Sequence, residues 1–350
     1  MNVRQYTIRP YREGDEFGII KLFKVVFQKD YDIARWNWLY RDNPVGIKTI
    51  MVAENHQGEI IAHYAVCPIR IIIDKEQKLG TVSLDTMVHP EYQGLGLFTK
   101  LASRLYESIA SQGMILTYGF PNKNSFHGFT KKLFWSDLTD NLQIYVRVLR
   151  VDRFLQNHLK PQILSSLGCP IAKNVIGAFN RIKKVEKPKV FKSLHCDNIS
   201  DNIDELWNRT ISNTHISVIR NKDYLTWRYL QNPGDKYHVI NTYDKQTLVG
   251  CAILKILERF GLKIGFIAEI LTDPSKPESI NELLLESMSY YEEQGVDMVA
   301  CLSLEKMTLN ARLKKNGFIR VPKIAYPQDF HFCILAHDNK EYITNSDNWI

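Results

Sequence analysis

The hydrophobic pattern of the first 150 residues changes repeatedly between the two-residue period of strands and the 3.6-residue period of helices. Alternating or wholly apolar runs bounded by turn residues predict strands at 6–9, 49–54, 60–73, 81–90, 114–120 and 141–150. Apolar residues at helical spacing predict helices at 12–27, 33–42, 97–113 and 124–135. The order β α α β β β α β α β predicts a mixed α/β domain over residues 1–150.

Residues 151–190 do not continue this order. Their helical spacing is interrupted by Pro161, Gly168 and Pro170, and the stretch 181–189 is basic. We interpret the segment as a helical linker between two domains. An amphipathic segment that lies on an anionic membrane surface is the alternative, and it would allow peripheral membrane contact.

The second half of the chain repeats landmarks of the first. Residues 33–46 and 223–235 both contain an aromatic cluster, a tyrosine and, three residues later, Asn-Pro. Residues 82–90 are echoed by 267–274, and 126–135 by 309–318. Three landmarks in the same order predict a duplicated fold, with the second copy at 191–350.

Length and composition limit the number of domains, the classes of ligand and the location of the protein. The 350 residues suggest two domains, and the formal charge of +7 favours anionic ligands. The basic residues are dispersed, so we expect no nucleic-acid partner. No run of 18 apolar residues and no N-terminal apolar segment is present, so we expect neither a transmembrane helix nor a signal peptide. Six cysteines without a CxxC pair indicate reduced thiols in a cytoplasmic protein, with no metal site.

The segment HPEYQGLGLFTK (89–100) places Gly94 and Gly96 between a predicted strand and a predicted helix. The first amides of a helix lack internal partners and carry partial positive charge, so glycines there allow a phosphate to reach the backbone. A purely structural turn is the alternative. The dinucleotide fingerprint GxGxxG is incomplete, and no Walker sequence GKS or GKT follows.

Together, the phrase VHPEYQGLGLFTKLA (88–102), the next strand and a helix with Asn122 and Lys131 resemble the GNAT acyltransferase superfamily. The pyrophosphate loop of that family reads Gln/Arg-x-x-Gly-x-Gly/Ala. Gln93 and Gly96 match its first and fourth positions, whereas Phe98 stands at the sixth. The resemblance covers residues 4–150, and 195–335 look like a second, degenerate copy, so we expect two tandem GNAT-like domains of mixed α/β fold.

The resemblance implies how acyl-CoA would bind. Its pyrophosphate would contact backbone amides of the loop formed by Gln93, Gly94, Leu95, Gly96, Leu97 and Phe98. Backbone groups of Met87 and Val88 and the side chain of Asn122 would hold the pantetheine arm. The second copy has no glycine after its proline, at 274, so it is not expected to hold CoA.

Direct acyl transfer requires one group that takes a proton from the amine and another that protonates the leaving thiolate. Asp85 is the candidate base, and strand alternation places it on one face with Ser83 and Met87. An exposed strand charge or a helix cap is the alternative. The family's usual tyrosine acid is replaced by Phe129, so Tyr118 and His127 are the candidate acids. A surface or capping role is the alternative for His127.

The second predicted helix borders the acceptor site in this fold. Trp36, Trp38 and Tyr40 are therefore candidates for stacking on an acceptor, with core packing as the alternative. Glu54 ends a strand and is a further candidate, although a turn carboxylate would look the same.

These features favour an N-acyltransferase that transfers an acyl group, most simply from acetyl-CoA, directly to a small amine or amino sugar. A non-enzymatic acyl-CoA-binding module is one alternative. A transferase for lipid-linked or cell-envelope precursors is another.

Overall fold

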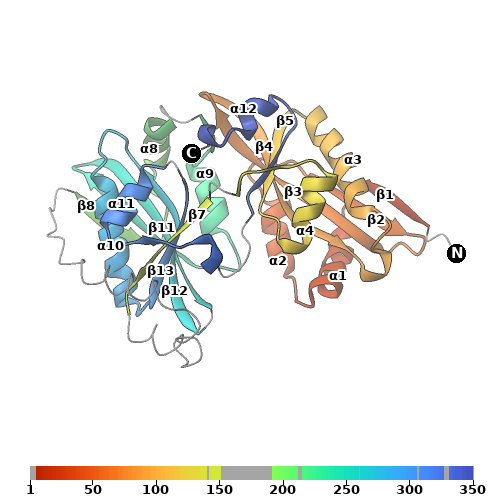
Figure 1. Cartoon of the computed structure of the whole chain (residues 1–350), viewed down its shortest axis with the longest axis horizontal. Helices are drawn as coiled ribbons and strands as arrows, with labels where there is room; N and C mark the ends of the chain where they lie inside the picture. The colour runs from red at the N-terminus through yellow and green to blue at the C-terminus, as the bar shows by residue number, and fades with distance from the viewer. Residues whose placement is uncertain are drawn as a thin grey trace.

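The computed structural model describes residues 5–139, 142–150, 191–211, 215–259, 261–305, 307–326 and 331–349. Two mixed α/β halves lie side by side, each built on its own sheet (Figure 1). This architecture confirms the mixed α/β fold class. The predicted linker, 151–190, with its basic stretch, lies outside the described residues. Among the helices that are described, none is long and apolar enough to cross a membrane.

The first sheet is flanked by helices on both faces. Its strand order is β1 (Tyr6–Pro10), β2 (Ile50–Asn55), β3 (Ile60–Ile73), β4 (Glu76–Val88), β5 (Met114–Gly119), β15 (Cys333–Ala336) and β6 (Ser136–Asp137), with β9 (Ile216–Val218) paired to β3. One face packs on α1 (Asp15–Phe27), α2 (Ile33–Trp36) and the π-helix η1 (Asn37–Arg41). The other packs on α3 (Leu97–Ser111), α4 (Lys123–His127) and the π-helix η3 (Gly128–Lys132).

The second sheet has the same layered plan. Its order is β14 (Ile319–Arg320), β7 (Leu142–Val148), β13 (Met298–Leu304), β12 (Leu262–Thr272), β11 (Thr247–Arg259), β10 (Tyr237–Asp244) and β8 (Lys192–Cys196). Helices α10 (Ser279–Glu293) and α11 (Leu309–Lys315) cover one face. The other carries α8 (Ile203–Thr210), α9 (Lys222–Leu225) and the π-helix η6 (Thr226–Leu230). A last helix, α12 (Lys340–Thr344), follows β15.

The two halves exchange strands. The sequence predicts that 141–150 completes the first domain, but β7 pairs with β13 from Leu142↔Leu304 to Val148↔Met298 in the second sheet. Its place beside β5 is taken by β15, from Cys333↔Gly119 to Ala336↔Leu116. Figure 1 shows the yellow β7 among elements of the second half. The boundary at residue 150 is therefore wrong as a limit of the first sheet, because an apolar run predicts a strand but not its neighbours.

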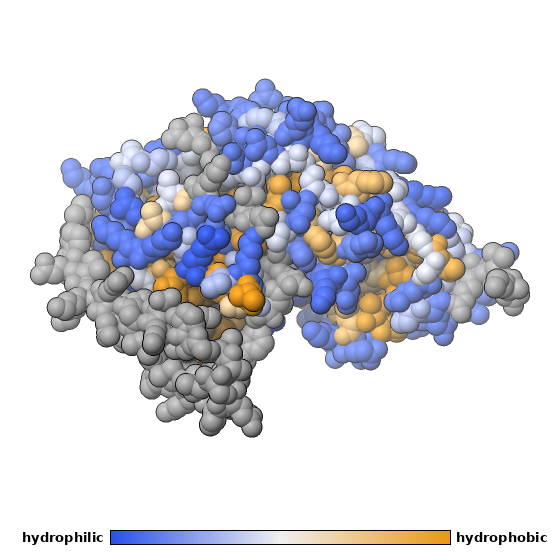
Figure 2. Space-filling model, in the orientation of Figure 1, coloured by the Kyte–Doolittle hydropathy of each residue, from blue (hydrophilic) through white to orange (hydrophobic). Residues whose placement is uncertain are grey.

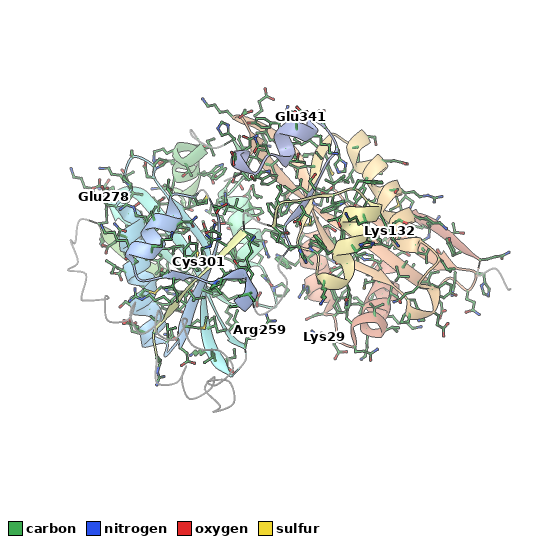
Figure 3. The ribbon with its side chains drawn as sticks, viewed as in Figure 1. Lys29, Lys132, Arg259, Glu278, Cys301 and Glu341 are labelled. Atoms are coloured by element: carbon green, nitrogen blue, oxygen red, sulfur yellow. The ribbon has the colours of Figure 1, made fainter. Side chains whose placement is uncertain are left out.

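Two tryptophans at repeated positions also join the halves. Trp38 on η1 donates its indole N–H to the carbonyl of Trp227 (2.6 Å), and Trp227 on η6 donates to the carbonyl of Trp38 (2.8 Å). Both side chains are buried, and their ring centroids lie 5.5 Å apart. Figure 3 shows that side chains of the two halves meet in the space between the sheets. Trp38 therefore belongs to the interface between the halves.

Apolar residues also reach the surface. Ile324 and Phe134 are 97% and 76% exposed, and Figure 2 shows apolar patches among hydrophilic residues on both halves. Single exposed apolar side chains are common on soluble proteins and carry no functional argument here.

Strand exchange predicts that the halves unfold together. We expect the substitution Ile334→Asp in β15, where the side chain is fully buried, to abolish cooperative folding of both sheets. Circular dichroism of the β-sheet signal and tryptophan fluorescence should lose their transitions together. The control Ile334→Val should cost only about 0.5–1.5 kcal/mol. A variant in which one half still melts cooperatively would contradict this coupling.

Candidate active site

The pairing between β4 and β5 stops partway along β4. Its registered pairs are Leu79↔Met114, Thr81↔Thr117 and Val82↔Tyr118. Beyond Val82, the residues 83–88 have no strand on that edge in the described part of the chain. Because backbone N–H and C=O groups need partners, this edge is available to an extended ligand.

A bulge in β4 accompanies the separation. Opposite β3, the register passes from His63↔Met87 to Ala65↔Leu84, so β4 has one extra residue. Asp85 lies in this bulge with φ of 47°, which is unusual for a residue with a side chain. The strain reorients the Asp85 side chain relative to a regular strand.

The loop that follows β4 has the geometry of an anion site. Gly94 and Gly96 have φ of 80° and 72°, and a Cβ on Gly94 would meet no atom within 4 Å. Gly96 precedes α3 without a side-chain cap, and the first turn of that helix has no acidic residue. Uncapped amides, the helix dipole and the open approach together fit a diphosphate. Gln93 is exposed and Leu95 is 39% exposed, whereas Leu97 is buried and anchors the helix start.

Phe98 occupies the loop position where the GNAT pattern has Gly or Ala. Its ring packs against Phe129 and Tyr64, with centroid distances of 5.2 and 6.2 Å. A Cβ at Gly128 would lie 2.8 Å from the Phe98 ring, so the glycine on η3 provides the space that Phe98 needs. Phe129 is 5% exposed and serves in this aromatic cluster.

The corresponding turn of the second half lacks these properties. No glycine lies between Asp273 and Ser279, and Glu278 stands at the N-cap of α10. A carboxylate at a helix N-terminus repels a phosphate and occupies the favourable end of the dipole. The second half therefore has no equivalent anion site at this turn.

Asp85 is held by two tyrosines. Tyr31 and Tyr40 donate hydrogen bonds to its Oδ2 at 2.8 and 2.9 Å. Burial, followed by the charge of Asp85, raises the pKa of both tyrosines, so both hydroxyls stay protonated. No cation pairs with Asp85 among the described residues, and its Oδ1 has no partner there. The site thus holds a fixed carboxylate with one oxygen available.

The prediction that Asp85 shares a face with Ser83 and Met87 is only partly right. It points toward Tyr31 and Tyr40, on the face that also contains Met87. Ser83, however, contacts the Tyr64 hydroxyl on the α3 face. The bulge breaks the two-residue alternation on which the prediction rests.

His63 on β3 supports the bulge. Its Nδ1 lies 2.7 Å from the Asp85 carbonyl oxygen, a distance at which Nδ1–H donates to that oxygen. Burial lowers the pKa of His63, so the ring is neutral at neutral pH. Neither His63 nor Tyr31 belongs to a sequence motif, and both lie far from Asp85 in the sequence. Sequence reasoning therefore did not predict that they contact Asp85.

Tyr118 is the last residue of β5 that pairs with β4. Its ring contacts Phe120, Phe332 and Trp349, and its hydroxyl has no hydrogen-bond partner in the described residues. Burial raises its pKa. Tyr118 packs on the same cluster as Tyr224, and Tyr224 also packs on the cluster of Tyr31 and Tyr40, toward which Asp85 points. The structure therefore brings the candidate base and this candidate acid to one face of the sheet.

Other candidates lie elsewhere or have other partners. His127 is exposed at the end of α4. The Oδ1 of Asn122 caps α4 by accepting the amides of Asn124 and Ser125, each at 3.0 Å, so only its amide nitrogen remains for a ligand. Trp36 is buried between Tyr11 and Tyr40, as core packing requires.

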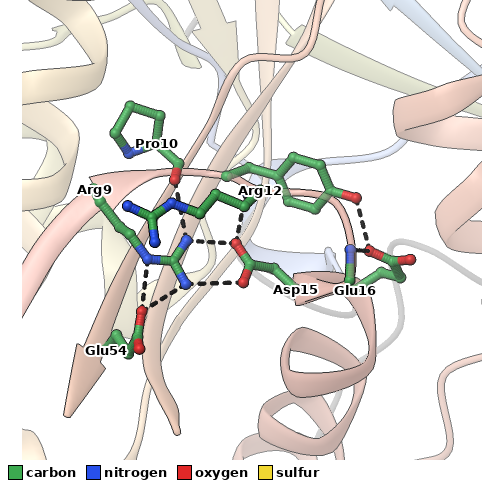
Figure 4. Close-up of polar contacts among 8 residues, drawn as sticks. Arg9, Pro10, Arg12, Asp15, Glu16 and Glu54 are labelled. Carbon is green, nitrogen blue, oxygen red and sulfur yellow. Dashed lines mark hydrogen bonds and ion pairs between the residues drawn. The ribbon is translucent and has the colours of Figure 1, made fainter. Parts of the chain in front are cut away.

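Glu54 belongs to an ion-pair cluster at the start of α1 (Figure 4). Arg9 donates a hydrogen bond to Glu54 at 2.6 Å and a bidentate pair of hydrogen bonds to Asp15 at 2.6 and 2.9 Å. The cluster joins β1, β2 and α1. These contacts give Glu54 a structural partner, and the structure does not bring it to Asp85.

Residues 7–133 match the family model described as "Acetyltransferase (GNAT) domain". The chain carries a GNAT acetyltransferase domain. This confirms the resemblance found in the glycine loop and supports an acyltransferase activity for the half that contains this domain. No curated protein matches the sequence.

Solved structures support the fold across both halves. A GCN5-related N-acetyltransferase from Anabaena variabilis has a TM-score of 0.65 at 11% identity, covering 95% of this chain and 73% of that one. A probable N-acyltransferase from Enterococcus faecalis has a TM-score of 0.63 at 12% identity, covering 96% and 73%. Saccharomyces cerevisiae N-myristoyltransferase with myristoyl-CoA has a TM-score of 0.58 at 13% identity, covering 94% and 79%.

The Arg9 cluster predicts a pH-dependent stability. Burial would raise the pKa of Asp15, but hydrogen bonds from Arg9 and from the backbone of Arg12 outweigh it and leave that pKa lowered. The stabilisation is thus complete above the unfolded pKa of about 4 and is lost as pH falls through the lower folded pKa. We expect Arg9→Gln to cost about 1–3 kcal/mol at pH 7 and much less near pH 3.

Urea unfolding at several pH values measures this difference. Lys24→Gln is the control, because its pair with Asp30 is exposed to solvent and should contribute little to stability at either pH. An equal loss for Arg9→Gln at pH 7 and pH 3 would show that the ion pair is not its cause.

Proposed function

We propose that the protein transfers an acyl group, acetyl in the simplest case, from acyl-CoA directly to the amine of a small acceptor. One observation carries the proposal. The unpaired edge of β4 leads from the glycine loop to the place where Asp85 and Tyr118 share one face. The myristoyl-CoA in the similar N-myristoyltransferase structure supports an acyl-CoA donor for this fold.

The binding residues follow from the open edge and the loop. Amides of residues 93–98 would hold the pyrophosphate, with Gly94 giving it room to approach. Backbone groups of Met87 and Val88 would hold the pantetheine arm, and the amide nitrogen of Asn122 could add a hydrogen bond. Acyl-CoA, when bound, supplies the activated thioester.

Asp85 and Tyr118 have complementary roles in this proposal. The free Oδ1 of Asp85 accepts the proton that the attacking amine loses. The Val88 amide donates to the oxyanion. Tyr118 stays protonated because burial raises its pKa, and its free hydroxyl can protonate the leaving thiolate.

Packing supports a short acyl group. Gly119 follows the last β4–β5 pair, and a Cβ there would lie 3.3 Å from Ser83 and 3.4 Å from Trp135. Tyr64, Tyr106 and Trp135 are linked by hydrogen bonds immediately behind this point. These aromatic side chains fill the space between the sheet and α3, which favours acetyl over longer chains.

We place the reaction in the cytoplasm, where CoA thioesters are available.

The second half is proposed to be a degenerate GNAT copy that shapes the acceptor site. It repeats the π-helix tryptophan of the first half, Trp227, and the tyrosine–carboxylate pair, with Tyr229 3.4 Å from Glu269. It lacks the glycine loop, so CoA binding is assigned to the first half alone.

The loop predicts where CoA binds. Acetyl-CoA at about 100 times its dissociation constant should add roughly 2.7 kcal/mol of stability, a thermal shift of several degrees. Gly94→Glu should remove this shift by adding a side chain and a negative charge. Gly113→Glu is a matched control, since Gly113 also has positive φ and open space but lies beyond the other end of α3. If both variants keep the shift, CoA does not use this loop.

Asp85 predicts the catalytic base. We expect Asp85→Asn to lower kcat for amine acetylation by about 10²–10⁴ while keeping the acetyl-CoA thermal shift. Release of free CoA measures the rate with a panel of amines. Asp30→Asn, at an exposed carboxylate, is the control. A rate for Asp85→Asn within about threefold of wild type would exclude Asp85 as the base.

A further inference from the structure

A tyrosine–carboxylate pair occurs in both halves, but its net charge differs between them. In the second half, Glu269 pairs with Arg220 at 3.0 Å, and both side chains are largely buried. In the first half, Asp85 takes only the two tyrosine hydroxyls. The second carboxylate is therefore neutralised inside the protein, whereas the first remains available to an amine.

Next to this pair, η6 carries a cation that has no counterpart in η1. Arg228 follows Trp227, and the residue that follows Trp38 is Leu39. The guanidinium lies 5.8 Å from the ring centroids of Trp38 and Tyr229. Arg228 thus crosses from the second half to the aromatic junction with the first.

Arg228 has no anionic partner within the described residues. Two acidic groups of the second half are already paired, Glu269 with Arg220 at 3.0 Å and Asp235 with Lys255 at 2.5 Å. The Arg228 side chain lies among aromatic rings and is only partly buried, and such a cation gains from an anionic partner. Its guanidinium is therefore available to an anion that comes from outside the described chain.

This cation shares its surroundings with the candidate catalytic groups. Arg228 lies over the ring of Trp38, which belongs to the same buried cluster as Tyr31 and Tyr40. These two tyrosines donate the hydrogen bonds to Asp85. Trp227, the neighbour of Arg228 on η6, lines a small open pocket between the halves together with Tyr224, Pro68 and Arg70. Trp227 and Tyr224 also pack on the cluster that contains Met87, so the pocket adjoins the face of the first sheet where the acceptor would bind.

We propose that Arg228 is the anion-binding group of the acceptor site, so that the acceptor is an amine that also carries a carboxylate or a phosphate. The inference rests on the proposed function and narrows its substrate class. The amine lies toward Asp85 and the anionic group pairs with Arg228. A guanidinium suits both anions because it can donate two parallel hydrogen bonds.

Matched acceptor pairs test the proposal. The pairs are an amino sugar with its phosphate ester, and an amino acid with its amide, so the two arms separate phosphate from carboxylate. With acetyl-CoA, wild type should prefer the anionic member of at least one pair by about ten- to hundredfold in kcat/KM. Arg228→Met should abolish that preference by raising KM for the anionic acceptor, and Arg228→Lys should retain part of the preference.

Arg41→Met is the matched control, because Arg41 lies on the equivalent π-helix with an exposed side chain paired to Asp42. It should leave the preference unchanged. Wild type without a charge preference in either pair would overturn the proposal, as would a preference that survives Arg228→Met. An equal loss for charged and neutral acceptors would show that Arg228 is only structural.

Calorimetry of the anionic acceptors without acyl-CoA keeps the two proposals distinguishable. Binding that Arg228→Met weakens about tenfold or more supports the anion site even if no acetyl transfer is found. Binding that the variant leaves unchanged, or no binding alongside normal acetyl-CoA turnover of neutral amines, contradicts it. If Arg228→Met fails to fold, Arg228→Lys and Arg228→Gln replace it in the same comparison.

Discussion

The central constraint in this molecule is the backbone of β4 beyond Val82, which loses its neighbour on one side. A strand inside a sheet normally satisfies its N–H and C=O groups on both edges. Here the bulge at Asp85 and the end of the β4–β5 pairing at Tyr118 leave one edge of 83–88 without a strand in the described part of the chain. The glycine loop follows this stretch, the candidate base lies within it, and the candidate acid lies where β5 separates from it. In the proposed function, this one interruption of the ladder provides both the donor path and the reacting face.

The features that sequence reasoning predicted are local ones. The order of strands and helices, the glycine loop and its helix follow from periodicity and backbone preference within short windows. Tyr31, His63 and Arg228 were missed, because their contacts with the site region arise from pairing between distant segments. The orientation of Ser83 was wrong for a related reason. A bulge depends on pairing with the neighbouring strand, so the alternation of residues within one strand does not reveal it.

The duplicated geometry shows how one arrangement can serve two purposes. Both halves place a tyrosine of a π-helix near a carboxylate in the strand before the main helix. In the second half, an arginine neutralises Glu269, so that pair stabilises the fold. In the first half, the carboxylate of Asp85 keeps one free oxygen. In the proposed function, this difference in charge at matching positions separates a structural role from a chemical one.

Strand exchange also affects how the chain is made. The place beside β5 is filled by residues 333–336, which leave the ribosome more than 200 residues after β5 itself. The first sheet therefore cannot close before residues 333–336 have been synthesised, and until then β5 has an open edge. Contacts of such long sequence separation slow folding and prolong exposure to aggregation. The acyltransferase half, although first in sequence, is completed last.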